Sequence, residues 1–218
     1  MTNEISTLED ELARFEIELP PDRVDLLTQY CGLLWDWNTK LNLTRHTDFE
    51  KFVTRDLVDT IELSKLIVAD EEVMDVGTGG GVPGIVLAVL RPDLQITLCE
   101  SVGKKCQAVD AILQDLGLPV TLFNARAESL LDDFRFDTTI ARAVGPLWKM
   151  CYWFKDHWLS VGRLLAVKGP NWTEERKEAR QRGLLHGVEM RKVASYPMVG
   201  TDSESVILKL WPKGAPER

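Results

Sequence analysis

Five glycines lie within eight residues of this chain, at positions 77, 79, 80, 81 and 84. The apolar run that precedes them, Glu72 to Val76, is predicted to be a strand, and Pro83 to Leu90 a helix with proline in its first turn. Glycine tolerates positive φ and lets a backbone pass close to a ligand. The segment is therefore predicted to be a strand-to-helix turn that contacts a ligand, with a purely structural tight turn as the alternative.

Beyond residue 70, short apolar runs alternate with helical stretches. Strands are predicted at 72–76, 95–99, 119–123, 137–141, 163–167, 188–196 and 206–210. Helices are predicted over 83–90, 101–116, 146–159 and 174–182. This alternation predicts an α/β fold with a mostly parallel, doubly wound sheet of seven strands, helices on both faces and an antiparallel pair at the end. Ligands of such sheets bind at the carboxyl ends of the strands.

The first seventy residues are predicted to be helical, because apolar residues recur at helical spacing from Leu8, from Val24 and from Phe49. We therefore expect a helical extension at 1–70 and one α/β domain at 71–218. The net charge of −8 argues against a protein that coats nucleic acid non-specifically. The four cysteines show no ligand spacing, so no metal site or disulfide is expected. No signal peptide or membrane span is apparent, which favours the cytoplasm.

Two features favour S-adenosylmethionine over NAD, although residues 79–84 also satisfy the dinucleotide pattern G-x-G-x-x-G. Asp75 lies two residues before Gly77, where a carboxylate suits an ammonium group better than a pyrophosphate. The helical extension and the seven strands match the Rossmann-like sheet of class I methyltransferases better than two mononucleotide-binding halves. Glu100 ends the second strand and is expected at the ribose, a position that NAD enzymes share.

Two arginines follow predicted strands at the ligand edge. Arg126 lies in the polar loop Asn124 to Glu128, and Arg142 follows the fourth strand, where methyl transfer is expected. A guanidinium there suits a phosphate or the O6/N7 edge of guanine, and a structural ion pair is the alternative. Lys168, which ends the fifth strand, could add a second charge. The fourth strand is not followed by an Asn-Pro-Pro-Tyr motif, which binds the exocyclic amine in amino-methylating enzymes. It is not followed by a cysteine either, so thiolate attack on a pyrimidine is not expected.

Taken in order, several segments resemble the glucose-inhibited division protein B family, the 16S ribosomal RNA guanine-N7 methyltransferases. The similarity runs from about Trp37 to Gly169 and comprises Asn42-Leu43-Thr44, Arg55 to Asp59, Asp75 to Gly84, Arg91-Pro92, Ser101 to Lys105, Arg126 to Glu128, Arg142-Ala143-Val144 and Lys168-Gly169. The resemblance implies a class I fold and a guanine of small-subunit RNA as substrate. It also implies that a cofactor pocket contains Gly77, Val82, Ala127, Glu128 and Arg142. Asp75, Gly79 and Glu100 complete the expected cofactor-binding set.

Two positions depart from the family. The family usually has Arg-His where this chain has Arg55-Asp56, and an arginine before the closing strand where residues 201–205 contain no basic residue. Both changes remove positive charge from regions that are expected near RNA. Arg55, Lys104, Lys105 and Lys168 are the expected RNA-binding residues, and Arg142 is expected to orient the substrate or the methionine carboxylate.

Guanine N7 carries a lone pair and no proton, so direct in-line attack on the methyl group needs no general base. The three histidines are accordingly assigned to surface or structure, and the tryptophans at 148, 153 and 158 to core packing in preference to base stacking. The expected partner of a monomeric enzyme is 16S ribosomal RNA or the small subunit. A methyltransferase for a small molecule or a protein, and an NAD-binding module, remain the alternatives.

Overall fold

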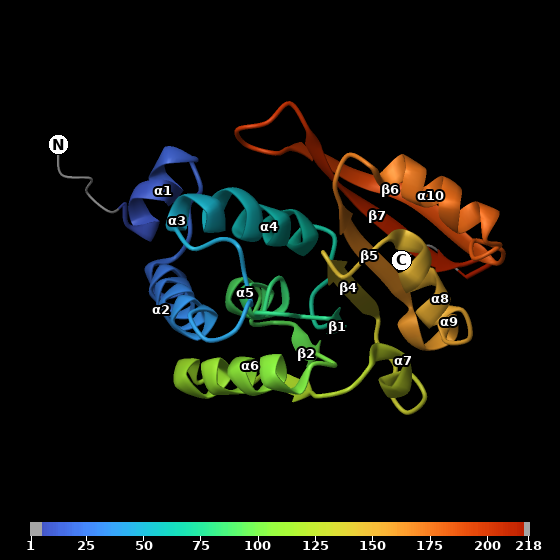
Figure 1. The fold of residues 1–218 in the computed structure, drawn as a ribbon, viewed down its shortest axis with the longest axis horizontal. Helices are drawn as coiled ribbons and strands as arrows, with labels where there is room; N and C mark the ends of the chain where they lie inside the picture. The colour runs from blue at the N-terminus through green and yellow to red at the C-terminus, as the bar shows by residue number, and fades with distance from the viewer. Residues whose placement is uncertain (1–5, 216–218) are drawn as a thin grey trace.

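A computed structural model describes residues 6–215. Its seven strands form one sheet in the order β3-β2-β1-β4-β5-β7-β6 (Figure 1). The strands are β1 (Glu72–Val76), β2 (Gln95–Cys99), β3 (Thr121–Phe123), β4 (Thr138–Arg142), β5 (Arg163–Lys168), β6 (Val188–Pro197) and β7 (Glu204–Pro212). The first five run parallel, and β7 lies antiparallel to both β5 and β6. The predicted α/β sheet is therefore confirmed, including its antiparallel end.

The N-terminal extension is helical, as expected. It contains α1 (Leu8–Arg14), α2 (Pro21–Asn38), α3 (Phe49–Lys51) and α4 (Val58–Ser64). Thr7 caps α1 in a capping box with Asp10, and Asp48 caps α3. The predicted third helix differs in one respect, because its middle, Phe52–Leu57, is a π-helix that joins α3 to α4. π-helical turns are rare in proteins, and those that occur often lie at functional sites.

The remaining helices are α5 (Gly84–Leu90), α6 (Gly103–Leu116), α7 (Ala127–Leu130), α8 (Leu147–Phe154), α9 (Trp158–Val161) and α10 (Trp172–Gln181). Three details differ from expectation. Residues 127–130 are a helix and not a loop, the helix predicted over 146–159 is divided into α8 and α9, and α6 begins without a side-chain cap from Ser101. The apolar periodicity of a sequence does not define where a helix begins or ends, because tertiary contacts decide these boundaries.

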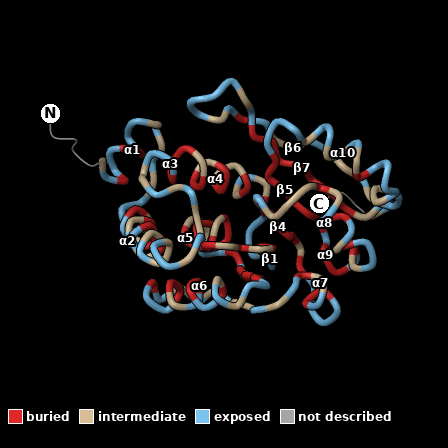
Figure 2. The backbone as a smooth tube through the Cα atoms, in the orientation of Figure 1, coloured by how far each residue is buried: buried red, intermediate tan, exposed pale blue. Residues whose placement is uncertain are grey.

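The sheet separates two apolar cores. Successive side chains of a strand point to opposite faces, so Val73 and Ile140 join one core while Met74 and Ala141 join the other. The first core contains α1, α2, α4, α5 and α6, and the second contains α7 to α10 (Figure 1). Buried residues accordingly follow the strands and the inner sides of the helices (Figure 2).

The extension is packed into the first core and does not form a separate core. Leu8, Leu27, Leu34 and Phe52 belong to the same buried cluster as Ile140 of β4. The division of the chain at residue 70 stays a prediction, but Leu34 and Thr44 of the extension lie beside the glycine turn, at the carboxyl edge of the sheet. Within residues 6–215, no helix has both the length and the apolar character that a membrane crossing requires.

Candidate active site

Two adjoining hollows lie at the carboxyl ends of the parallel strands, where the order of the strands reverses between β1 and β4. The first hollow has a volume of about 360 Å³ and the second about 390 Å³. The first is lined mainly by the loops after β2, β3 and β4, and the second by the glycine turn, the extension and Arg142. Both are lined by Gly77, Ser101, Val144 and Trp153. This is the position at which doubly wound sheets bind ligands.

The glycine turn forms the floor of the second hollow. Gly77, Gly79 and Gly81 have φ values of 67°, 62° and 105°. A Cβ atom on Gly77 would lie 3.0 Å from a methyl carbon of Val144. Gly77 is therefore required both for its backbone conformation and for the close approach of the β4 loop.

Glu100 joins the glycine turn to the loop after β2. Its carboxylate accepts hydrogen bonds from the backbone N–H of Gly79 at 3.0 Å and of Val102 at 2.8 Å. It lines the second hollow and is 5% exposed. Gly77, Gly79 and Val82 line the same hollow, so these four expected cofactor residues lie together.

Asp75 has a different place from the expected one. Its side chain is fully buried and lines neither hollow, and its Oδ2 accepts a hydrogen bond from the N–H of Gly84 at 2.9 Å. Burial raises the pKa of Asp75 to about 6, against the opposing effect of this hydrogen bond. The carboxylate therefore stabilises the glycine turn through its hydrogen bond with Gly84. Because Asp75 is fully buried, it does not contact the ammonium group of a cofactor as the sequence led us to expect.

The loop after β3 forms the wall of the first hollow. Ala127 and Glu128, which were expected in the cofactor pocket, line this hollow together with Ala125 and Arg126. The side chain of Arg126 is 75% exposed and lies 3.8 Å from Glu128. Its charge is therefore available to a ligand or to RNA.

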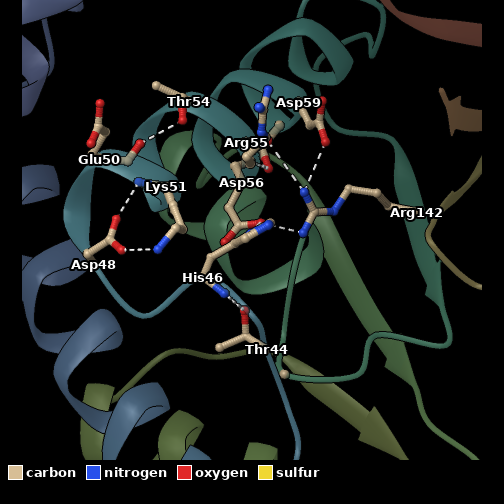
Figure 3. A network of polar contacts seen from close by, with 12 residues as sticks. Thr44, His46, Asp48, Glu50, Lys51, Thr54, Arg55, Asp56, Asp59 and Arg142 are labelled. Atoms are coloured by element: carbon tan, nitrogen blue, oxygen red, sulfur yellow. Dashed lines mark hydrogen bonds and ion pairs between the residues drawn. The ribbon is translucent and has the colours of Figure 1, made fainter. Parts of the chain in front are cut away.

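Arg142 lies at the end of β4 inside a network of carboxylates (Figure 3). Its guanidinium forms ion pairs with Asp56 and, at 2.9 Å, with Asp59, and its Nε has no partner among the described residues. Burial would lower the pKa of Arg142, but the two carboxylates raise it above its ordinary value. Burial raises the pKa of Asp59 although Arg142 opposes this shift. Arg142 thus forms the structural ion pairs that were the alternative expectation, and it also lines the second hollow.

The network continues outward from the two carboxylates. His46 Nδ1 lies 2.8 Å from Asp56, and the hydroxyl of Tyr196 donates to Asp59 at 2.8 Å. Asp56 is 1% exposed, so the acid that replaces the family's histidine does not face RNA but balances Arg142. The assignment of His46 to structure fits this pairing, whereas the sequence contained no sign of its proximity to Arg142.

The expected RNA-binding residues have different environments. Lys104 is exposed, and Lys105 is half-buried and lines the second hollow. Arg55 donates to the carbonyl of Val199 at 2.9 Å, which ties the extension to the β6–β7 hairpin. Lys168 requires a correction: its side chain is 7% exposed and its Nζ contacts Glu175 at 2.8 Å and the Gly145 carbonyl at 2.5 Å. Its charge is therefore used inside the protein and not offered to RNA.

Two residues of the second hollow, Leu34 and Thr44 of the extension, were not singled out as site residues by sequence reasoning. Lys149 lines the first hollow, and Trp153 lines both. Thr44 lies in the motif Asn42-Leu43-Thr44, which was the available signal. Trp153 packs at the edge of the second core, as expected for a tryptophan of this helix, but it also faces the ligand hollows. No group of three or more metal-ligating side chains lies together within residues 6–215.

Comparison with known proteins identifies the family. The GidB family model, rRNA small subunit methyltransferase G, matches residues 23–204. The chain belongs to this family. The resemblance seen in the motifs is thereby confirmed. A ribosomal RNA small subunit methyltransferase G from Rhodopirellula baltica is 51% identical over 187 residues, which cover 86% of this chain and 81% of that protein. The protein of the same name from Chromobacterium violaceum is 32% identical over 96% of this chain and 99% of its own.

Solved structures support the fold at much lower identity. A putative O-methyltransferase from Klebsiella pneumoniae has a TM-score of 0.57 at 16% identity and covers 97% of this chain and 99% of its own. A ribosomal protein L11 methylase from Lactobacillus delbrueckii subsp. bulgaricus has a TM-score of 0.53 at 16% identity, with coverage of 74% and 78%. The class I, Rossmann-like architecture predicted from the sequence is confirmed.

Proposed function

We propose that this chain transfers a methyl group from S-adenosylmethionine to N7 of a guanine in 16S ribosomal RNA. The observation that carries the proposal is the pair of hollows that meet at Gly77 and Val144, at the switch point of a sheet from the small-subunit methyltransferase G family. We expect the enzyme to act as a monomer in the cytoplasm, with the RNA or the small subunit as its substrate.

The residues of the site fit the cofactor. The two hollows together have room for a ligand of its size. In the proposed arrangement Ala127 and Glu128 would hold the adenosyl half and the glycine turn the methionine half. Glu100, which lines the second hollow, would accept hydrogen bonds from the ribose hydroxyls. When bound, S-adenosylmethionine supplies a methyl group activated by the sulfonium.

The chemistry of the lining residues is compatible with positioning as the main contribution of the site. No histidine lines either hollow within residues 6–215. Burial raises the pKa of the Cys99 thiol, which lines the first hollow, to about 12, so this cysteine stays protonated. Guanine N7 needs no base, because its lone pair is free. The protein therefore contributes alignment and charge placement, and we assign the orientation of the base or of the methionine carboxylate to Arg142.

Exposed cations at the rim provide the contact with RNA in this proposal. Arg45, Lys104 and Lys149 are exposed and have no ion pair within the described part of the chain, and Lys105 lines the second hollow. Because Lys149 lines the first hollow, cations stand at both hollows of an acidic protein, as phosphate binding requires.

The decisive experiment combines two measurements. Calorimetry should detect binding of S-adenosylhomocysteine and no comparable binding of NAD. Tritiated S-adenosylmethionine should then label one guanine when the enzyme is incubated with unmodified 16S RNA or small subunits, and N7-methylguanine should disappear at that position in cells without the protein. Absence of label in every form of the RNA would overturn the proposal.

A further inference from the structure

Trp153 differs from the other tryptophans of the described chain in its surroundings. It is the only aromatic residue among the described residues that line the two hollows, and it lines both. Its neighbours Trp148 and Trp158 are engaged within the protein, Trp148 beneath the guanidinium of Arg182 at 4.0 Å and Trp158 against Phe154 at 6.0 Å. No ring or cation of the described residues is stacked on Trp153.

The position of Trp153 along the site is equally specific. If the first hollow holds the adenosyl half of the cofactor and the second the methionine half, the residues shared by both hollows would surround the methyl-bearing sulfur. These residues are Gly77, Ser101, Val144 and Trp153. A base that attacks the methyl group must arrive at the same point.

We propose that the indole of Trp153 is the surface on which the target guanine stacks while its N7 faces the methyl group. The inference rests on the proposed function and adds to it the residue that positions the base. Enzymes that modify a base take it out of its stack, and an aromatic side chain replaces the contact that the base loses. A planar ring also restricts the base to one plane, which favours in-line attack.

Two neighbouring features fit this role. Trp153 is half-buried and packs against the second core, so its indole is supported from behind by the protein. Lys149 lies one turn earlier on α8, is exposed and lines the first hollow. Its charge is suitably placed to bind a phosphate next to a base stacked on Trp153.

The test compares Trp153→Leu with Trp148→Leu, a tryptophan of the same helix that lines neither hollow. We expect Trp153→Leu to lower kcat/KM for small-subunit RNA by about 10- to 100-fold, the usual range for loss of one stacked base. The Kd values for S-adenosylmethionine and S-adenosylhomocysteine should change by less than about 3-fold. Trp153→Phe should recover part of the activity, and Trp148→Leu should resemble the wild type.

A second readout does not depend on turnover. Guanosine monophosphate, added to enzyme saturated with S-adenosylhomocysteine, should quench tryptophan fluorescence in the wild type and in Trp148→Phe but not in Trp153→Phe. Persistent quenching in Trp153→Phe overturns the proposal, even if Trp153→Leu does not fold.

Other results also contradict it. Equal losses of affinity for S-adenosylmethionine and S-adenosylhomocysteine in Trp153→Leu would place the ring on adenine. A loss for S-adenosylmethionine alone would indicate a cation–π contact with the sulfonium. Unchanged activity of Trp153→Leu refutes only the stacking, whereas a wild-type enzyme that methylates no RNA refutes the proposed function and the stacking with it.

Discussion

Arg142 is held by charges from a distant part of the chain. Asp56 and Asp59 lie on the helix of the extension, more than eighty residues before Arg142, and both bind its guanidinium. Asp56 is 1% and Asp59 9% exposed. Removing one partner from a buried ion pair is costly, because the remaining charge stays without compensation. The ion pairs thus connect the extension to the carboxyl end of β4.

We predict that Arg142→Ala lowers the free energy of unfolding by about 3–5 kcal/mol. Arg142→Lys should also destabilise the protein, since one ammonium cannot match two carboxylates held by a planar guanidinium. Lys65→Ala breaks an exposed pair with Glu62 and should cost about 1 kcal/mol or less. Urea denaturation at pH 7 gives all three values, and equal values for Arg142→Ala and Lys65→Ala would show that the buried network contributes nothing.

Asp75 makes stability depend on pH with a defined sign. Its pKa in the folded protein is about 6, above the value of an exposed carboxyl. A carboxyl with a raised pKa contributes most to stability below its unfolded pKa and loses this contribution as the pH rises through its folded pKa.

We therefore predict that Asp75→Asn becomes more stable relative to the wild type between pH 4 and pH 7, by on the order of 1–3 kcal/mol. The asparagine oxygen can still accept the N–H of Gly84, so the turn should be retained. The measurement is urea denaturation of both proteins across this range. A difference that stays constant with pH would mean that Asp75 does not titrate there.

At the scale of elements, the effect of Gly77 on backbone conformation can be distinguished from its effect on ligand binding by comparison with a second glycine. Gly77 and Gly117 share a φ of about 62° to 67°, but a Cβ on Gly77 would press on Val144, whereas a Cβ on Gly117 would meet nothing within 4 Å. Gly117 ends α6 and is far along the chain from the turn. The two glycines are a matched pair for substitution.

Gly117→Ala is predicted to cost about 1 kcal/mol of stability and to leave cofactor affinity unchanged. Gly77→Ala should lose S-adenosylhomocysteine affinity by at least about 10-fold in addition, because the hollows meet at this residue. Calorimetry and thermal unfolding of both variants provide the comparison. Equal affinity of the two variants would remove Gly77 from the binding site.

The π-helix shows what a sequence pattern cannot reveal at this scale. Apolar periodicity predicted one helix from Phe49 to about Leu66, and the described helix ends at Ser64. The π turn within it carries Asp56, which faces Arg142 and His46. A local pattern contains no information about these partners, because they belong to other segments.

At the scale of the whole molecule, a net charge of −8 is compatible with an RNA substrate, because a few lysines at the site are enough to contact phosphate groups locally. Lys104 is exposed and Lys105 lines the second hollow, whereas Lys168 is buried against Glu175. The three lysines therefore should differ in their contribution to the salt dependence of binding.

We predict that Lys104→Ala and Lys105→Ala each reduce the slope of log Kd against log salt by about 0.7–1. Lys168→Ala should leave this slope unchanged and lower thermal stability. Filter binding of small-subunit RNA between 50 and 200 mM salt measures the slopes, a range in which such contacts weaken strongly. A reduced slope for Lys168→Ala would show that Lys168 does contact RNA.

The sequence by itself determined the sheet and the glycine turn, because strand alternation and glycine conformations are local properties. It also determined the family, through motifs in a fixed order. The tertiary structure alone decided that Asp75 is buried, that Lys168 is paired, that Asp56 contacts both Arg142 and His46, and that Trp153 lines both hollows. Each of these depends on contacts between different elements of the fold. Burial and charge pairing arise only when the extension, the sheet and the later helices pack together.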